Sequence, residues 1–132
     1  MNRRSSTRFF TLWLLGTLLM LAACGGNPGA PAPQQPDGGD PVRGLQVLQT
    51  YGCPACHAVP GVRGPKAWIG PPLINWAARQ YVAGVLPNTP ENLIYWIRYP
   101  QDVVPGNAMP NLNVNEQDTR DISAYLYTLR DE

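Results

Sequence analysis

The segment C-P-A-C-H, residues 53–57, constrains this chain more than any other feature of its sequence. It places the thiols of Cys53 and Cys56 three residues apart, with the imidazole of His57 directly after them. His57 is the only histidine among 132 residues, and the whole sequence holds three cysteines. Such a cluster is typical of a metal site, a redox-active dithiol or a cofactor attachment point. The rest of the sequence must distinguish between these three possibilities.

Residues 1–23 have the pattern of a secretory signal peptide. Arginines at positions 3, 4 and 8 precede an apolar run over residues 9–21, which is too short for a stable membrane span. An uncleaved N-terminal anchor is the alternative interpretation of the same pattern.

The segment L-A-A-C-G, residues 21–25, resembles the lipobox of bacterial lipoproteins. That resemblance implies that Cys24 is lipidated and becomes the first residue of the mature protein. Two or more acyl chains on one residue suffice for stable anchoring. We therefore expect an exported protein of the cell envelope, lipid-anchored to a membrane and facing the periplasm or the outer side of the cytoplasmic membrane. The choice between inner and outer membrane stays open.

Residues 24–40 are rich in Gly, Pro and Gln and contain no large apolar side chain. This composition cannot bury a core, so it predicts a disordered tether. Residues 41–132 remain for one small domain. Without the three arginines of the signal, seven basic residues stand against nine acidic ones. No basic run remains, and a nucleic-acid partner is not expected.

The domain is predicted to be all-α. Asp40 and Thr89 each precede a proline, which is the pattern of a capping residue followed by the first helical position. Asn115 is a third capping residue, with Asp118 in the capping-box position. Helices are therefore expected over residues 41 to about 51, 73 to about 82, 90–99 and 116–129. Long loops of the kind that carry function join them.

Three interpretations of C-P-A-C-H can be compared. A structural zinc site needs four ligands, and the domain offers two cysteines and one histidine with no suitably spaced carboxylate. A thioredoxin-type dithiol expects a βαβ context, and no strand is predicted here. C-x-x-C-H is also the attachment signature of c-type haem, in which two thiols bind the cofactor and the histidine coordinates iron. Export favours this third interpretation.

Met109 strengthens the haem interpretation. It is the only methionine left after the signal is removed, and it lies in a loop between Pro105 and Pro110. A methionine is more often a core filler, but a rigid loop suits a thioether held on iron. Ligation by histidine and methionine raises the reduction potential of a haem and favours electron transfer.

Four segments of the domain together resemble the class I, mitochondrial-type cytochromes c in their short bacterial form. They are GLQVLQTYGCPACH at 44–57, GPPL at 70–73, the stretch 93–109 ending in PGNAM, and DISAYL at 121–126. The resemblance covers nearly the whole domain. It implies a small cytochrome c fold, with three to five helices wrapped around one covalently bound haem c.

The resemblance also implies a role for individual residues. Cys53 and Cys56 would form the thioether bonds, and His57 and Met109 would be the two axial iron ligands. Pro71 would accept a hydrogen bond from the Nδ1–H group of His57 through its backbone carbonyl, which fixes the imidazole tautomer.

Some positions depart from the family pattern or stay open. Trp96 stands where the family often has a tyrosine near the methionine sulfur, and because an indole N–H can only donate, the hydrogen bonds there should differ. Asn107 stands where a threonine commonly helps to order the same region. Gly44 and Tyr125 match the place where the two terminal helices cross. Arg79 is a candidate partner for a haem propionate, and three aromatic residues share that candidacy: Trp68, Trp76 and Tyr81.

The function implied by the resemblance is one-electron transfer by a membrane-tethered, monomeric carrier that is not itself an enzyme. The expected redox partners are a cytochrome c oxidase or another terminal acceptor on one side, and a quinol-oxidising complex or dehydrogenase on the other. Two alternatives stay open. In the first, the chain is the haem subunit of a larger oxidoreductase. In the second, it is a ligand-binding or peroxidatic haem protein in which Met109 is labile.

Overall fold

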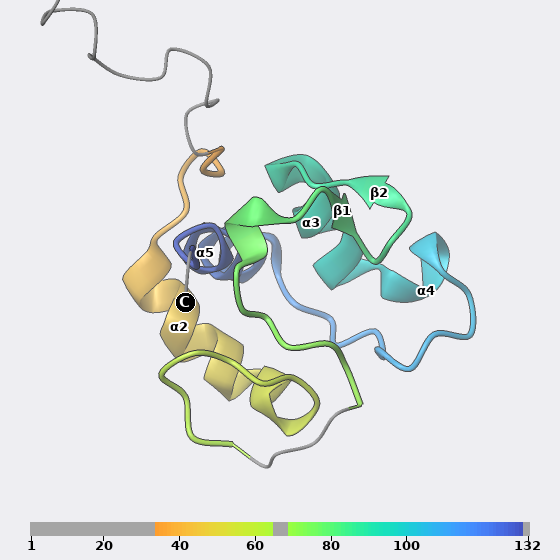
Figure 1. Cartoon of the computed structure of the whole chain (residues 1–132), viewed down its shortest axis with the longest axis horizontal. Helices are drawn as coiled ribbons and strands as arrows, with labels where there is room; N and C mark the ends of the chain where they lie inside the picture. The colour runs from red at the N-terminus through yellow and green to blue at the C-terminus, as the bar shows by residue number, and fades with distance from the viewer. Residues whose placement is uncertain (1–33, 65–68, 131–132) are drawn as a thin grey trace, which may run out of the picture. The chain divides into compact units, whose positions relative to one another are not determined.

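The computed structural model of the chain describes residues 34–64 and 69–130. Four helices dominate this part of the chain, as Figure 1 shows, and the predicted helical fold class is confirmed. The helices are α2 (Pro41–Thr50), α3 (Pro90–Arg98), α4 (Pro100–Val103) and α5 (Glu116–Leu126). Two 3-10 turns, η2 (Cys53–Ala55) and η3 (Trp76–Ala78), and two short strands, β1 (Tyr81–Val82) and β2 (Leu86–Pro87), complete the set.

The three predicted helix starts are confirmed. Asp40 caps α2 by accepting hydrogen bonds from the backbone N–H groups of Val42 and Arg43. The Thr89 hydroxyl accepts a bond from Asn92 N at the start of α3, and Asn115 accepts one from Asp118 N at the start of α5. Each cap satisfies a backbone donor that the first helical turn leaves unpaired.

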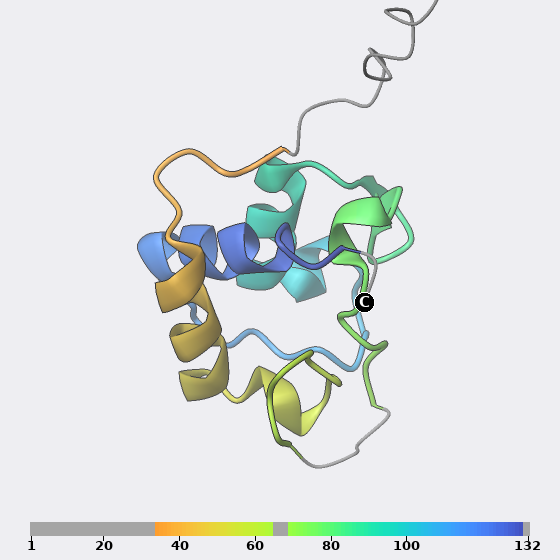
Figure 2. The ribbon, with the colours of Figure 1, turned by 60° about the vertical axis from the view of Figure 1, so that its left-hand side comes forward.

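Helices α2 and α5 cross closely, as Figure 2 shows. A Cβ atom added to Gly44 would lie 2.0 Å from the backbone oxygen of Asp121 and 2.9 Å from the Cβ of Tyr125. Only glycine fits at this crossing. Leu48, Ile122 and the Tyr125 ring bury the apolar side of the same contact. The predicted crossing of Gly44 with Tyr125 is therefore confirmed.

A partly buried polar network joins the same two helices, and no pattern in the sequence indicates it. The guanidinium of Arg43 on α2 donates to the carboxylates of both Asp118 and Asp121 on α5. Tyr51 donates its hydroxyl proton to Asp118 over 2.8 Å. Asp118 thus turns its carboxylate toward α2, and the same carboxylate also accepts a hydrogen bond from the side-chain amide of its capping partner Asn115 over 2.7 Å.

The predicted helix over residues 73–82 is wrong. The chain there forms the single turn η3 and then a β1–β2 hairpin with Val82 paired to Leu86. Asn75 and Ala83 adopt positive φ angles of 49° and 52°, which a continuous helix does not allow. The prediction that the domain contains no strand is also wrong, because β1 and β2 form this short hairpin. The Asn88 side chain holds the hairpin by donating to the carbonyls of Trp76 and Arg79.

Two other boundaries also differ from the prediction. Residues 100–103 were expected in a loop but form the one-turn helix α4, since proline at the first helical position is already set for it. The last helix ends at Leu126 and not near position 129.

The segment before α2 is more ordered than we predicted. Pro36 is buried, and the carbonyl of Gly38 accepts a hydrogen bond from the Gln117 side chain over 2.9 Å. Asp40 N donates to Asp121 over 2.8 Å, which ties the segment to α5. The expected disordered tether therefore does not extend through residues 36–40. Its earlier part and Cys24 lie outside the described residues.

Within residues 34–64 and 69–130, none of the helices has both the length and the apolar character needed to cross a membrane.

Candidate haem site

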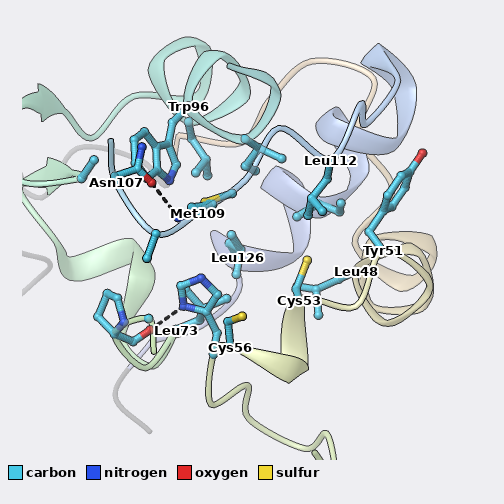
Figure 3. A pocket seen from close by; sticks show the side chains of 18 of the residues that line it. Leu48, Tyr51, Cys53, Cys56, Leu73, Trp96, Asn107, Met109, Leu112 and Leu126 are labelled. Atoms are coloured by element: carbon cyan, nitrogen blue, oxygen red, sulfur yellow. Dashed lines mark hydrogen bonds between the residues drawn. The ribbon is translucent and has the colours of Figure 1, made fainter. Parts of the chain in front are cut away.

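A cavity of about 450 Å³ lies inside the domain. This volume falls in the range of about 300–1,000 Å³ that is usual for small-molecule and cofactor sites. Its walls are mostly apolar, with Leu48, Leu93 and Leu126 among them. All the cofactor and metal residues predicted from the sequence reach it: Cys53, Cys56, His57, Pro71, Arg79, Trp96 and Met109. Figure 3 shows the two cysteines on one side of the cavity and Met109 on the other.

The C-P-A-C-H segment enters the cavity directly after α2. Gly52 adopts a φ of 75°, which glycine tolerates without strain, and this redirects the chain into η2. The backbone N–H groups of Cys56 and His57 both donate to the carbonyl of Cys53. One tight turn therefore presents two thiols and an imidazole to the same space.

The two thiols are free in this structure. Burial raises the pKa of Cys53 to about 11, so its thiol is protonated at neutral pH. Redox-active dithiols instead need a cysteine with a lowered pKa, because the thiolate is the reactive form. Together with the absence of a βαβ unit in the described residues, this disfavours the thioredoxin-type interpretation.

His57 is held by the loop that follows it. Its Nδ1 atom lies 2.7 Å from the carbonyl oxygen of Pro71, the contact implied by the family resemblance. A carbonyl can only accept, so Nδ1 carries the proton and Nε2 keeps its lone pair for a metal. Gly70 packs against the ring, and a Cβ there would lie 2.2 Å from the Cε1 atom of His57. Gly70 N also donates to the carbonyl of Cys56, which fixes this loop against the motif.

Met109 reaches the cavity from the loop after α4. Trp96 lies beside it in Figure 3, on α3. The side-chain oxygen of Asn107 accepts a hydrogen bond from Met109 N over 2.7 Å, and its amide nitrogen donates to the carbonyls of Pro100 and Val104. Asn107 therefore orders the methionine loop, as expected for a residue in its place.

Trp76 and Arg79 supply the polar part of the cavity wall. The indole N–H of Trp76 is buried and has no hydrogen-bond partner among the described residues, although most buried donors are paired. Arg79 stacks 4.8 Å from the Trp76 ring centre and donates to the carbonyls of Pro72 and Ile74. Tyr81 also lines the cavity, and Trp68 lies outside the described residues.

These groups fit a haem c. The cavity combines two thiols, an imidazole with an available Nε2, a thioether and a buried donor that an anionic group from the cavity would satisfy. Among the described residues, no group of three or more His, Cys, Asp and Glu side chains could hold a metal ion. A zinc site is thus disfavoured on the geometry of its would-be ligands.

Sequence reasoning missed two polar residues at the edge of this site. Gln101 bonds the methionine loop from α4, and Tyr51 both lines the cavity and donates to Asp118. Both lie within the family-like segments 44–57 and 93–109, but no pattern there marks their partners, so only the folded structure reveals their contacts.

A model of the cytochrome c family matches residues 41–130. Cytochrome c oxidase subunit 2 of Alkalihalophilus pseudofirmus is 42% identical over 89 residues, which are 67% of this chain and 25% of that protein. The proteins of the same name from Bacillus sp. (strain PS3) and Bacillus subtilis are 32% and 30% identical, over 70% and 68% of the chain.

The chain spans only about a quarter of the length of these relatives, with 28% and 26% of the two Bacillus proteins covered. The likeness therefore concerns one domain of each. Within that domain, the match to the family extends from the start of α2 to the residues after α5. The chain belongs to the cytochrome c family, whose covalently bound haem c transfers electrons.

Proposed function

We propose that this protein is a membrane-tethered, one-electron carrier with a single haem c that delivers electrons to a respiratory oxidase. One observation carries the proposal. A single cavity is lined by Cys53, Cys56 and His57 from one turn of the chain and by Met109 from a distant loop.

Different residues of the cavity would hold the cofactor and shield it from solvent. Haem bound here supplies one-electron exchange at its iron. Cys53 and Cys56 would hold it by thioether bonds, and His57 Nε2 would bind the iron because Nδ1 is committed to Pro71. Met109 would be the second iron ligand, and with it in place the site would be closed to an exogenous ligand. The role is that of a carrier and not of an enzyme.

The opening of the cavity is the proposed contact surface for redox partners. Ile69 and Tyr81 line the cavity and are 63% and 56% exposed. Exposed apolar side chains beside a cofactor suit the small, transient interfaces of electron-transfer proteins. The predicted charge of the mature chain is small, so long-range steering contributes little. The names of the relatives support cytochrome c oxidase as the acceptor. A quinol-oxidising complex or a dehydrogenase is the proposed donor.

Oxidation by membranes tests this proposal. The haem-loaded, chemically reduced protein would be mixed with membranes of its source cell, and its reoxidation followed by absorbance, with and without an oxidase inhibitor. We expect fast, inhibitor-sensitive reoxidation with weak dependence on salt. Reoxidation no faster than in buffer alone would contradict the proposal.

A second candidate function is that of a haem subunit within an oxidase complex. It is favoured by the matched relatives, which are themselves named as oxidase subunits. Gentle detergent extraction followed by size separation distinguishes the two. A monomeric carrier elutes alone, whereas a subunit elutes with the oxidase.

Cys24 is the proposed attachment point to the membrane, on the exported side of the cell envelope. Support comes from the lipobox-like sequence around it. A Cys24→Ser variant should be released into the soluble fraction of the cell envelope or the medium. Mass spectrometry of the native N-terminal peptide should show an acylated cysteine, and an unmodified one would contradict the proposal.

A further inference from the structure

Both backbone polar groups of Met109 are bonded to side chains. Its N–H donates to Asn107 over 2.7 Å, and its carbonyl accepts from the amide nitrogen of Gln101, also over 2.7 Å. The place of the thioether in the cavity therefore depends on two side-chain amides.

Gln101 bonds to three points of the methionine loop. Its amide nitrogen donates to the carbonyls of Asn107 and Met109, and its oxygen accepts from Gly106 N over 3.0 Å. Only this orientation of the amide satisfies all three contacts, because a carbonyl cannot donate and a backbone N–H cannot accept. Gln101 thus spans residues 106–109 with one donor end and one acceptor end.

Helix α4, which carries Gln101, is held in place by burial and by hydrogen bonds. Gln101 lies on α4, whose first residue, Pro100, is almost completely buried. Asn107 donates to the carbonyls of Pro100 and Val104, at the two ends of the same helix. Helix α4 and the loop are therefore joined into one unit by two side-chain amides, and Gln101 makes the contact with the Met109 carbonyl.

We propose that Gln101 is a positioning residue that keeps the Met109 thioether in the cavity and thereby closes the iron site to outside ligands. This inference rests on the proposed function, in which Met109 is an axial ligand. The resemblance to cytochromes c did not single out this position.

Binding of imidazole to the oxidised, haem-loaded protein tests the inference. Gln101→Glu keeps the acceptor for Gly106 but replaces both donors with an anionic oxygen facing two carbonyls. Losing two ordinary hydrogen bonds should raise the apparent affinity for imidazole by roughly tenfold. The weak absorption band of iron bonded to a methionine sulfur should disappear at lower imidazole concentration than in the unaltered protein. Gln101→Leu removes all three bonds and should have the larger effect.

Two control variants separate positioning from general destabilisation. Asp102→Asn changes the exposed neighbour on the same helix and should leave the affinity unchanged. Tyr127→Phe removes a partly buried hydrogen bond to Asn88 outside the cavity, so it should lower thermal stability without opening the iron site.

Each outcome has one meaning. Imidazole affinity of Gln101→Glu within twofold of the unaltered protein, with the methionine band intact, overturns the inference while leaving the carrier function in place. A missing methionine band in the unaltered protein instead overturns the assignment of Met109 in the proposed function, and the inference with it. If Gln101→Leu fails to mature, the Gln101→Glu result decides.

Discussion

Gly44 on α2 lies against the backbone of Asp121 on α5 so closely that an added Cβ would come within 2.0 Å of the Asp121 carbonyl oxygen. This contact sets how near the two helices approach. It also brings Arg43 within reach of Asp118 and Asp121, so the polar network depends on the same glycine.

Gly44→Ala should destabilise the protein by about 1–3 kcal/mol, because the obstacle is backbone, which cannot move without separating the helices. Alanine would otherwise favour a helix over glycine. Chemical denaturation of the haem-loaded protein measures the change. Gln46→Ala, at an exposed position of the same helix, is the control and should be neutral or slightly stabilising. A stabilised Gly44→Ala protein would show that the helices do not cross as described.

Acid should weaken the α2–α5 contact through Asp121. Burial alone raises the pKa of this carboxyl, but hydrogen bonds from Asp40 N, Arg43 and Gln117 outweigh it and bring the pKa below its ordinary value of 3.8. A lowered pKa gives stability that is present above the unfolded-state pKa and lost as the pH falls through the folded-state value.

The unfolding free energy should therefore fall as the pH drops below about 4. In Asp121→Asn, which lacks the charge, the fall between pH 7 and pH 3 should be smaller. Denaturation curves at the two pH values measure this difference. An equal fall in both proteins would remove Asp121 as a source of the pH dependence.

Gly70→Ala should disturb the proximal ligand. A Cβ at this position would lie 2.2 Å from His57 Cε1, so the imidazole must tilt and lose its bond to Pro71. We expect a weaker iron–histidine bond, seen as a shift of the haem spectrum toward high spin, and a stability loss of about 1–3 kcal/mol. Pro71→Ala keeps the backbone carbonyl and should change the spectrum little. A Gly70→Ala spectrum identical to that of the unaltered protein would contradict the packing described.

Trp76→Phe tests whether the unpaired indole N–H serves an anionic haem propionate. A hydrogen bond to the ionised form lowers the pKa of such a group, so its removal should raise that pKa. The pH range over which the reduction potential falls should then move upward. Potentiometric titration across pH measures the shift, with Tyr127→Phe as a control outside the cavity. An unchanged pH profile would mean that Trp76 does not donate to a titrating group.

Much of the site could be predicted from the sequence because its key residues stand in short, local patterns. The C-P-A-C-H turn and the caps at Asp40 and Thr89 involve neighbours in the chain, so their geometry follows from residue type and spacing. Pro71 follows the motif closely enough that family resemblance placed its carbonyl against His57.

The remainder depends on contacts between distant residues. Arg43 donates a hydrogen bond to Asp121, which lies 78 positions away in the sequence, and no local pattern marks the two residues as partners. The predicted helix over residues 73–82 does not form, because Asn75 and Ala83 take positive φ angles in the tertiary fold and the chain makes the turn η3 and the start of a hairpin instead. The role of Gln101 could not be predicted from the sequence either, because its contact with Met109 forms only when α4 and the methionine loop fold together.

The absorption spectrum of the matured protein, oxidised and then reduced, tests the central claim most directly. We predict a low-spin c-type spectrum from covalently attached haem, with the weak ferric–methionine band present and abolished in Met109→Ala. A high-spin spectrum would mean an open iron site and contradict closure by Met109. A matured protein without covalent haem would contradict the entire account of Cys53, Cys56 and His57.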